Sequence, residues 1–332
     1  MIHTDPATAA PAFASMLAPA KRILLLTHVN PDGDAIGSML ALWHVLTDMG
    51  KTPLAIASSA LPSYIEGLPG IEHVRVYHRG MALPETDLIW MVDTATLMRV
   101  GQIYDDCTAS LSNRPLLIVD HHVTNTGEGT LNLIAPESAS TADLLYRLFR
   151  AIDVYITPEI ATCLLMGLTT DTQSFQTSST NPQALRTAAE LLEAGADHYA
   201  VVQAVYYSTP YSTLQLVGMA LSQLQQDDDL VWTNVSWAML RATGAEDEAS
   251  DDIVNRMQRM AGMRACALFK ERADGTVKIS LRAKPGLDVA AIAGIWGGGG
   301  HTQAAGATLS MGLEEAQREV LHQLREALGR KQ

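Results

Sequence analysis

The sequence predicts an α/β fold, in which a parallel sheet with helices on both faces is followed by a smaller α/β domain. Short apolar runs such as Ile23–Leu26 and Leu116–Val119 alternate with segments of helical periodicity, as is typical of strand–helix–strand units. The length of 332 residues corresponds to about two domains. Near residue 225 the pattern changes to strands of a second, smaller unit.

Five short apolar runs predict the strands of the first domain. Ile23–Leu26 is continuously apolar, as expected of a strand buried on both faces of a parallel sheet. The other runs are of similar length and cover Leu54–Ala57, Val74–Tyr77, Leu88–Val92 and Leu116–Val119.

Capping residues and apolar spacing predict the helices between these strands. Asp34–Met49 is apolar at helical spacing and stops at Gly50, a favourable residue after a helix. Thr157-Pro158 and Asn181-Pro182 each place an N-cap before a proline at the first helical position. We predict a loose arm or short helix over the first 20 residues, and helices over 34–49, 140–152, 158–169 and 182–192.

The second half predicts a helical linker and a smaller domain. Residues 198–224 are mostly helical in pattern. Strand patterns follow at 230–237, 265–271 and 277–282, interleaved with helical patterns at about 250–260, 288–296 and 313–328. We therefore divide the chain into a first domain over 1–197, a linker over 198–224 and a second domain over 225–332.

The charge distribution bears on the class of partner. The net charge is −13, whereas a protein that binds duplex DNA by neutralising phosphates is usually basic, so we expect no duplex DNA partner. Residues 1–205 carry 10 basic and 21 acidic side chains, and residues 206–332 carry 13 and 15. Eight of the basic residues, Lys270 among them, lie in 253–290. The acidic first part suits cations, and this basic window suits an anion.

Cysteine usage and hydropathy bear on the compartment. Cys107, Cys163 and Cys266 lie far apart, which excludes a disulfide framework and a thiolate zinc finger and suits a reducing cytoplasm. The longest apolar runs are strand-sized rather than membrane-sized, and the first residues lack the pattern of a signal peptide. We expect a cytoplasmic protein without a membrane partner.

Acidic and histidine side chains follow three of the predicted strands. Ligands of open α/β sheets bind outside the carboxyl ends of the strands, and most of these residues lie at that edge. The set is His28, Asp32 and Asp34 after the first strand, Asp93 after 88–92, Asp120, His121 and His122 after 116–119, and Asp171 after the 158–169 helix.

Each of these residues alone has an ordinary explanation. A histidine after a strand is commonly a surface residue, Asp34 reads as a helix N-cap and Asp120 as a turn residue. Together, however, five carboxylates and three histidines at one sheet edge would repel one another when buried. Divalent cations remove that cost, and mixed imidazole and carboxylate donors suit Mn²⁺, Zn²⁺ or Fe²⁺. A central carboxylate could bridge two ions ~3.5–4 Å apart, the arrangement for in-line attack on phosphorus.

A glycine run marks the second domain. Gly297–Gly300 precedes His301, and Ala304-Ala305-Gly306 follows. Such a run is either a flexible hinge or a close backbone approach to a ligand, where N–H groups bind an oxyanion. Arg282 ends one predicted strand and Arg264 opens another, and an arginine fork can bind a terminal phosphate through two hydrogen bonds. We expect the other cations, Arg256, Arg259, Arg272 and Lys278, to form a solvated face.

These motifs together resemble one known family, the DHH–DHHA1 phosphoesterases, over residues 22–310. The carrying residues are His28-x-x-x-Asp32-x-Asp34, Asp93, Asp120-His121-His122, Asp171 and the Gly-Gly-Gly-His-x-x-Ala-Ala-Gly stretch at 298–306. Within that family the chain is most similar to the nanoRNase group, described as oligoribonucleases and 3′-phosphoadenosine 5′-phosphate phosphatases. The resemblance implies that the first domain is a DHH catalytic domain and the second a DHHA1 substrate-binding domain.

The resemblance also implies a role for each site residue. Two divalent ions, which we expect to be Mn²⁺, would be bound, one by His28, Asp32 and Asp93 and the other by Asp34, Asp93, His121 and Asp171. The catalytic pair would be His122 beside the scissile phosphate and Asp120, which orients a histidine. In the second domain the far phosphate and sugar of the substrate would contact Arg264, Arg282, His301 and the backbone of Gly298, Gly299 and Gly300.

The resemblance leaves substrate choice open. Many relatives have glycine where Gln173 follows Thr172, so the cleft here could be narrower, and Phe175 could stack on a base or belong to the core. The expected substrates are short single-stranded oligonucleotides or small phosphorylated nucleotides, and the expected assembly is a homodimer. The alternatives are a linear or cyclic dinucleotide phosphodiesterase, a single-strand exonuclease, an inorganic pyrophosphatase of the same superfamily, and a non-catalytic nucleotide-binding regulator.

Overall fold

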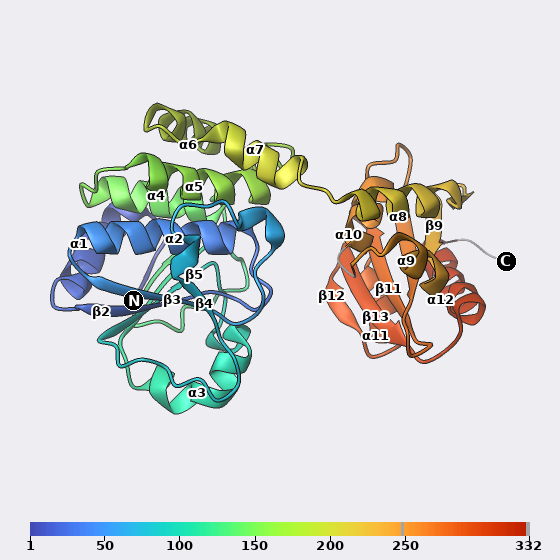
Figure 1. The fold of residues 1–332 in the computed structure, drawn as a ribbon, viewed down its shortest axis with the longest axis horizontal. Coiled ribbons are helices and arrows are strands. Elements are labelled where there is room, and N and C mark those ends of the chain that lie inside the picture. The colour runs from blue at the N-terminus through green and yellow to red at the C-terminus, as the bar shows by residue number, and fades with distance from the viewer. Residues whose placement is uncertain (247–248, 330–332) are drawn as a thin grey trace. The chain divides into compact units, whose positions relative to one another are not determined.

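The chain folds into two compact units, shown in Figure 1. The computed structural model describes residues 1–246 and 249–329. The first unit covers Met1–Ser208 and the second begins at Thr209. The region 198–224 contains α7 (His198–Tyr206) in the first unit and α8 (Tyr211–Ser222) in the second.

The first unit contains a seven-stranded sheet in which every strand pairing is parallel. The strand order is β1-β7-β6-β5-β2-β3-β4, so the strands that precede the acidic motifs, β2, β5 and β6, are immediate neighbours. The bounds are β1 Ile2–His3, β2 Arg22–Leu26, β3 Thr52–Ala57, β4 Val74–Val76, β5 Leu88–Val92, β6 Leu116–Asp120 and β7 Leu131–Ile134.

Helices cover both faces of this sheet, which confirms the predicted fold class. On one face, buried residues of α1, α2, α4 and α5 form a core with the sheet, and on the other face α3 does so. The bounds are α1 Pro6–Leu17, α2 Gly33–Asp48, α3 Gln102–Ser112, α4 Thr141–Ala151, α5 Pro158–Asp171 and α6 Pro182–Glu193, with 3₁₀ turns η1 Ser63–Ile65, η2 Ile71–His73 and η3 Leu97–Val100.

Helices α2 and α5 pack closely because glycines lie at their contact. A Cβ atom at Gly37 would collide with the carbonyl oxygen of Cys163, and one at Gly167 would collide with the carboxylate of Asp34. Only glycine permits these approaches. This packing brings the start of α2 next to the end of α5, where Asp171 is the last residue.

Several predicted helix starts are confirmed, and one interpretation is wrong. Thr157 and Asn181 accept hydrogen bonds as N-caps of α5 and α6. The N-cap of α2 is Asp32 rather than Asp34, because its Oδ1 accepts from the backbone N–H groups of residues 34 and 35 at 3.0 Å each. Asp34 is thereby free for another role.

Four elements of the first unit have weak sequence signals, namely β1, α1, β7 and α3. The first 20 residues form β1 and α1, and Phe13 of α1 packs 5.6 Å from Trp90 between ring centroids. β7 is only four residues long. α3 buries only Ile103 and Leu111 completely, so its apolar periodicity is too sparse to predict a helix.

The second unit has a six-stranded mixed sheet in the order β12-β13-β11-β10-β9-β8. Helices α11 and α12 contribute to the core on one face, and α8, α9 and α10 to the core on the other. The bounds are β8 Gln225–Asp227, β9 Leu230–Val235, α9 Trp237–Thr243, α10 Ala249–Gln258, β10 Ala265–Glu271, β11 Val277–Ala283, α11 Val289–Gly294, β12 Gly299–His301, β13 Ala304–Leu309 and α12 Leu313–Ala327.

Two details differ from the sequence prediction. The strand predicted for 230–237 ends at Val235, because the Ser236 side chain caps α9. Part of the glycine run is neither hinge nor loop, since Gly299–His301 forms an edge strand that pairs with β13 in antiparallel register.

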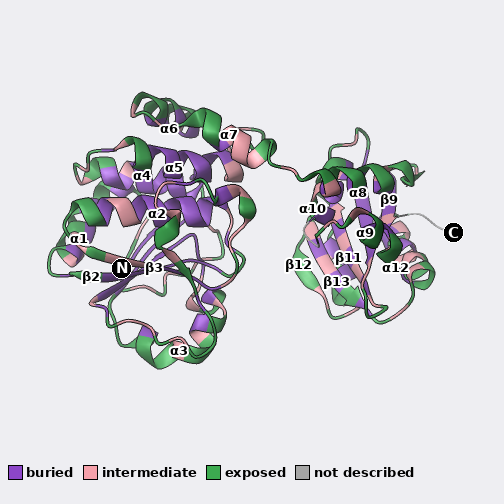
Figure 2. Cartoon of the chain, in the orientation of Figure 1, coloured by how far each residue is buried: buried purple, intermediate pink, exposed green. Residues whose placement is uncertain are grey.

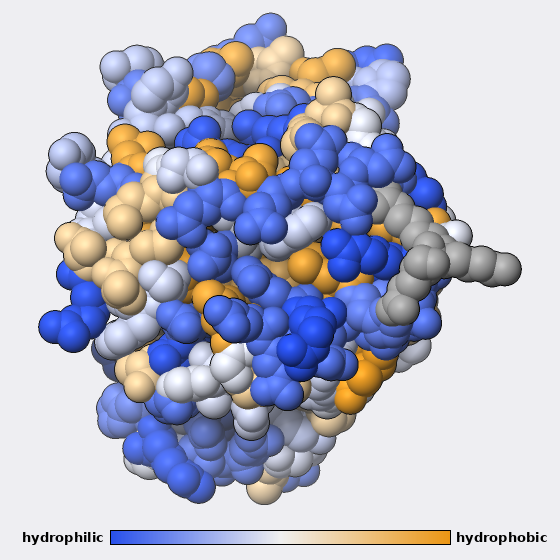
Figure 3. Space-filling view, turned by 90° about the vertical axis from the view of Figure 1, so that its right-hand side faces the viewer, coloured by the Kyte–Doolittle hydropathy of each residue, from blue (hydrophilic) through white to orange (hydrophobic). Residues whose placement is uncertain are grey.

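Burial follows this layered arrangement. Buried residues lie on the strands and on the helix faces turned toward them, as Figure 2 shows. In the surface view of Figure 3, hydrophilic residues predominate and hydrophobic ones occur in small, separate groups. Within the described residues, no helix combines the length and apolar character needed to cross a bilayer.

Candidate metal centre

The order of the strands brings the acidic and histidine residues to one place. His28 follows β2, Asp93 directly follows β5, and Asp120 is the last residue of β6. Because β6, β5 and β2 are parallel neighbours, their carboxyl ends lie side by side. Asp34 in the first turn of α2 and Asp171 at the end of α5 complete the group.

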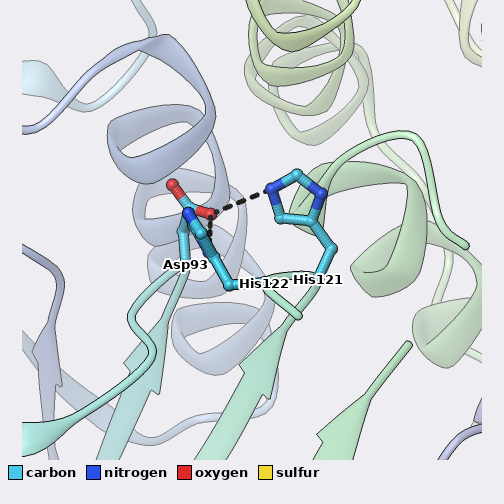
Figure 4. Close-up of side chains that lie close together, drawn as sticks. All are labelled: Asp93, His121 and His122. Carbon is cyan, nitrogen blue, oxygen red and sulfur yellow. Dashed lines mark ion pairs between the residues drawn. The ribbon is translucent and has the colours of Figure 1, made fainter. Parts of the chain in front are cut away.

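Asp93 lies among three histidines. Its Oδ2 is 3.3 Å from His28 Nε2, and its Oδ1 is 3.5 Å from His121 Nε2 and 3.6 Å from His122 Nδ1. Figure 4 shows the two contacts of Oδ1. The side chain is almost completely buried, and the backbone has a left-handed φ of 53°, a conformation that costs free energy for a non-glycine residue. Asp93 is therefore the central carboxylate of the cluster.

Among the residues that the structure describes, three groups of donor atoms have the spacing of metal sites, each with ligand atoms within 4.8 Å of one another. Asp93 belongs to two of these groups and His121 to two. The groups are His28, Asp32 and Asp93; Asp34, His121 and Asp171; and Asp93, His121 and His122. The first group is the ligand set that the resemblance implies for one ion. The second group contains three of the four residues implied for the other ion and lacks Asp93, whose Oδ1 nevertheless lies 3.5 Å from His121 Nε2.

The third group is the weakest candidate. His122 Nδ1 lies 2.7 Å from Asp120 Oδ1, much closer than its 3.6 Å distance to Asp93. A ring nitrogen whose proton binds a carboxylate has no lone pair left for a metal ion. His122 is therefore paired with Asp120 and lies beside the cluster without completing it.

Asp120 is completely buried and has a full set of partners. Its Oδ1 also accepts from the backbone N–H of His121 at 2.9 Å, and its Oδ2 accepts from Asn125 Nδ2 at 2.7 Å. Carboxylates that orient a histidine in this way are common around metal sites. The sequence pattern gives no sign of Asn125, since an asparagine in a loop is ordinarily a turn residue.

Burial raises the pKa of two acidic residues of the cluster, Asp34 and Asp171. The pKa of Asp34 is well above its usual range because of burial and then the charges of Asp171 and Asp93. Burial is also the main cause that raises the pKa of Asp171 to about 6, although its hydrogen bond with His121 opposes the shift. These carboxylates therefore repel one another when all are ionised. Divalent cations would relieve that repulsion, so the donor set fits such ions.

His121 has the opposite shift. Burial alone would lower its pKa, but the Asp171 hydrogen bond and the charges of Asp34, Asp171 and Asp93 raise it to about 10. Its Nε2 lies 3.1 Å from Asp171 Oδ2. Without a bound metal ion, the protonated His121 ring therefore carries a positive charge that partly offsets the negative charges of these carboxylates.

In the second unit, two residues expected to contact substrate share one sheet face. Arg282 pairs with Ala304 in antiparallel register, and Ala304 in turn pairs with His301. Side chains of directly paired residues point to the same side of a sheet, so Arg282 and His301 lie on one face, separated by an alanine. A Cβ atom at Gly298 or Gly300 would collide with a backbone oxygen of β13, which explains glycine at both positions.

Two basic residues of the second unit are placed differently. Arg264 Nη1 lies 3.2 Å from Asp229 Oδ2, and its side chain is about half exposed. Lys270, which the sequence places in an anion-binding window, is only 2 % exposed, with Nζ 3.1 Å from Ser250 Oγ. Because of this burial, Lys270 does not contribute to an anion site at the surface.

Comparisons with known proteins agree with this geometry. The DHH family N-terminal domain matches residues 22–168, and the DHHA1 domain matches residues 234–330. A bifunctional oligoribonuclease and PAP phosphatase from Thermus thermophilus is 34% identical over 311 residues, which cover 93% of this chain and 90% of that protein. A cyclic-di-AMP phosphodiesterase from Listeria monocytogenes is 26% identical over 93% of this chain, but the match covers only 48% of that protein.

The fold comparison extends over both units. The crystal structure of an exopolyphosphatase-related protein from Bacteroides fragilis has a TM-score of 0.88, with 28% identity over 96% of each chain. The similarity to the Thermus protein covers nearly the full length of both sequences. With both domain models matched, the chain belongs to the DHH–DHHA1 family of metal-dependent phosphoesterases.

Proposed function

We propose that the protein hydrolyses short oligonucleotides, including dinucleotides, to mononucleotides and converts 3′-phosphoadenosine 5′-phosphate to AMP. The observation that carries this proposal is the position of Asp93, whose two carboxylate oxygens face His28 on one side and His121 on the other. Such a carboxylate suits a bridging role between two divalent ions. The substrates are proposed because the Thermus relative is named for both activities and matches over nearly its whole length.

The proposed metal ligands follow the donor groups. His28, Asp32 and Asp93 would hold one ion, and Asp34, Asp93, His121 and Asp171 the other. Mn²⁺ is proposed because mixed imidazole and carboxylate donors without thiolates suit it. When bound, such ions supply positive charge that lowers the pKa of water and stabilises negative charge on phosphoryl oxygens.

His122 is the proposed general acid. Its hydrogen bond with Asp120 raises its pKa, which favours the protonated ring. Because Nδ1 is paired with Asp120, Nε2 remains to polarise a phosphoryl oxygen or to protonate the leaving oxygen. Asp120 would act through His122 by fixing the orientation of the ring.

The second unit is proposed to bind the far end of the substrate. Arg282 and His301 share a sheet face, and both can donate hydrogen bonds to a phosphate. The backbone of Gly298, Gly299 and Gly300 would contact the same group. Arg264 would join only by leaving Asp229, so its contribution is expected to be the smaller one.

The remaining assignments complete the proposal. Residues 1–197 would carry catalysis and 225–332 substrate binding, joined by the 198–224 linker. We infer a cytoplasmic homodimer that acts on small anionic substrates and not on duplex DNA, since the net charge of −13 disfavours long nucleic acids. A cyclic dinucleotide phosphodiesterase is the second candidate, because the Listeria relative, which is named a cyclic-di-AMP phosphodiesterase, matches 93% of this chain.

A substrate panel tests the function. Purified protein with Mn²⁺ would be offered a dinucleotide, a longer single strand, 3′-phosphoadenosine 5′-phosphate, a cyclic dinucleotide and pyrophosphate. We expect the highest kcat/KM for the dinucleotide and the bisphosphorylated adenosine. Preference for the cyclic dinucleotide would favour the second candidate, and preference for pyrophosphate would indicate a pyrophosphatase. Metal binding without turnover of any substrate would indicate a regulator.

A further inference from the structure

One buried residue outside the proposed ligand set contacts both halves of the metal centre. Thr141, the first residue of α4, is completely buried. Its backbone N–H donates to Asp34 Oδ2 at 2.7 Å, and its hydroxyl donates to Asp93 Oδ1 at 3.1 Å. Asp34 and Asp93 lie in different donor groups by spacing, and in the proposed ligand sets Asp93 serves both ions whereas Asp34 serves one. A single residue therefore links the two carboxylates on which the two proposed ion positions depend.

The Thr141 hydroxyl contacts Asp93, the carboxylate proposed to bridge the two ions, whose orientation decides where its two oxygens point. Asp93 Oδ1 is the oxygen that faces His121 and His122. A carboxylate oxygen can accept more than one interaction, so the Thr141 hydroxyl restricts the rotation of Asp93 without occupying the oxygen completely. The left-handed backbone of Asp93 is unfavourable by itself, and its position must be maintained by such contacts.

Thr141 is in turn held by a buried network on α4. The Ser140 side chain accepts from the backbone N–H of Asp143 at 3.1 Å and caps the helix. The Asp143 carboxylate accepts from Ser138 Oγ at 2.7 Å and from Thr187 Oγ1 of α6 at 2.7 Å. The first turn of α4 is thus fixed to a second helix, and Thr141 has a defined position.

We propose that Thr141 is a positioning residue, whose hydroxyl aligns Asp93 with Asp34 so that both metal positions fill together. This inference rests on the proposed two-metal function. Loss of a hydrogen-bonding partner of a metal ligand typically costs ~10–100-fold in metal affinity. Removal of the Thr141 hydroxyl should therefore raise the Kd for Mn²⁺ about 10-fold or more, while the backbone contact to Asp34 is retained.

The experiment compares Thr141→Val, which removes only the hydroxyl at nearly constant shape, with Thr141→Ser, which keeps it. Mn²⁺ binding to the full chain would be measured by calorimetry after removal of bound metal. Thermal unfolding in chelator would report stability, and dinucleotide kinetics would separate kcat from KM. Thr162→Val serves as the control, because this largely buried hydroxyl on α5 donates to the Pro158 carbonyl at 2.7 Å, outside the site.

We expect Thr141→Val to bind Mn²⁺ more weakly and to lose kcat at fixed metal, with Thr141→Ser near the wild type. Thr162→Val should keep the wild-type Kd whatever its stability. An unchanged Mn²⁺ Kd in Thr141→Val, or a lower unfolding temperature as its only effect, would overturn the positioning role. A wild-type protein that binds no Mn²⁺ would instead contradict the proposed function itself, so the two failures are distinguishable.

Discussion

The two groups of site residues in this chain are built by different means. In the first unit, Asp93, Asp34 and Asp120 are almost completely buried and each side chain has hydrogen-bond partners that fix it. In the second unit, His301 is exposed and the arrangement depends on backbone pairing of β12 with β13. A buried cluster with many hydrogen bonds is costly to alter, whereas an exposed face depends on fewer contacts. Because the first group is proposed to hold the metal ions and the second to bind the far end of the substrate, changes in the first should mainly lower kcat and changes in the second should mainly raise KM.

The largest effect is expected from Asp93→Ala. This change removes the carboxylate common to two donor groups. Mn²⁺-dependent dinucleotide hydrolysis should fall by more than the ~100-fold that loss of an outer partner costs. Circular dichroism in chelator should show a folded protein. Near-normal turnover would contradict the bridging role of Asp93.

The next effect concerns His122. His122→Ala should lower kcat by ~10²–10⁴-fold, the usual contribution of a general acid, with a smaller change in KM. Mn²⁺ affinity measured by calorimetry should stay near the wild-type value, since His122 Nδ1 is paired with Asp120. A large loss of Mn²⁺ affinity would instead assign His122 to the metal ligands.

An intermediate effect, a rise in KM, is expected for Arg282→Ala, which tests whether the second unit binds substrate. A hydrogen bond to a charged group contributes ~1.5–3 kcal/mol, so KM for the dinucleotide should rise about 10-fold or more with kcat nearly unchanged. Arg272→Ala is the matched control, because Arg272 lies beyond the other end of the β10–β11 pair. Equal effects of the two variants would remove Arg282 from substrate binding.

The smallest effect is a pH dependence of stability in the metal-free protein. The pKa of His121 is raised to about 10 in the folded state, against ~6.5 when unfolded. Protonation of His121 therefore stabilises the fold fully below pH ~6.5, and this contribution is lost as the pH rises through about 10. In chelator, the unfolding temperature should fall over this range, and less steeply in His121→Gln. Equal slopes in the two proteins would argue against this charge pairing.

Much of the fold could be predicted because its signals are local. Continuous apolar runs mark β2, β5 and β6, and the N-caps Thr157 and Asn181 mark helix starts. The edge strand β12 could not be predicted, since glycine has low strand propensity and Gly299–His301 becomes a strand only through its pairing with β13.

The candidate site divides in the same way. Residues directly after strands could be predicted, because parallel strands bring their carboxyl ends together. Thr141 could not be predicted, since it lies 48 residues from Asp93 and 107 from Asp34 along the chain. A threonine at a helix start is ordinarily expected to interact only with the backbone of its own helix. Lys270 belongs to the basic window over 253–290 but is buried, because strand position, and not the basic character of its neighbours, decides exposure.

The glycines between α2 and α5 have a consequence for how the centre tolerates sequence change. At Gly167 a methyl group would occupy the volume now filled by an oxygen of Asp34, and at Gly37 it would force the two helices apart. The spacing between Asp34 on α2 and Asp171 on α5 thus depends on the absence of side chains at Gly37 and Gly167, where the two helices touch. A substitution several residues away from any metal donor could in this way change the reaction by widening the scaffold, with every reactive group still present.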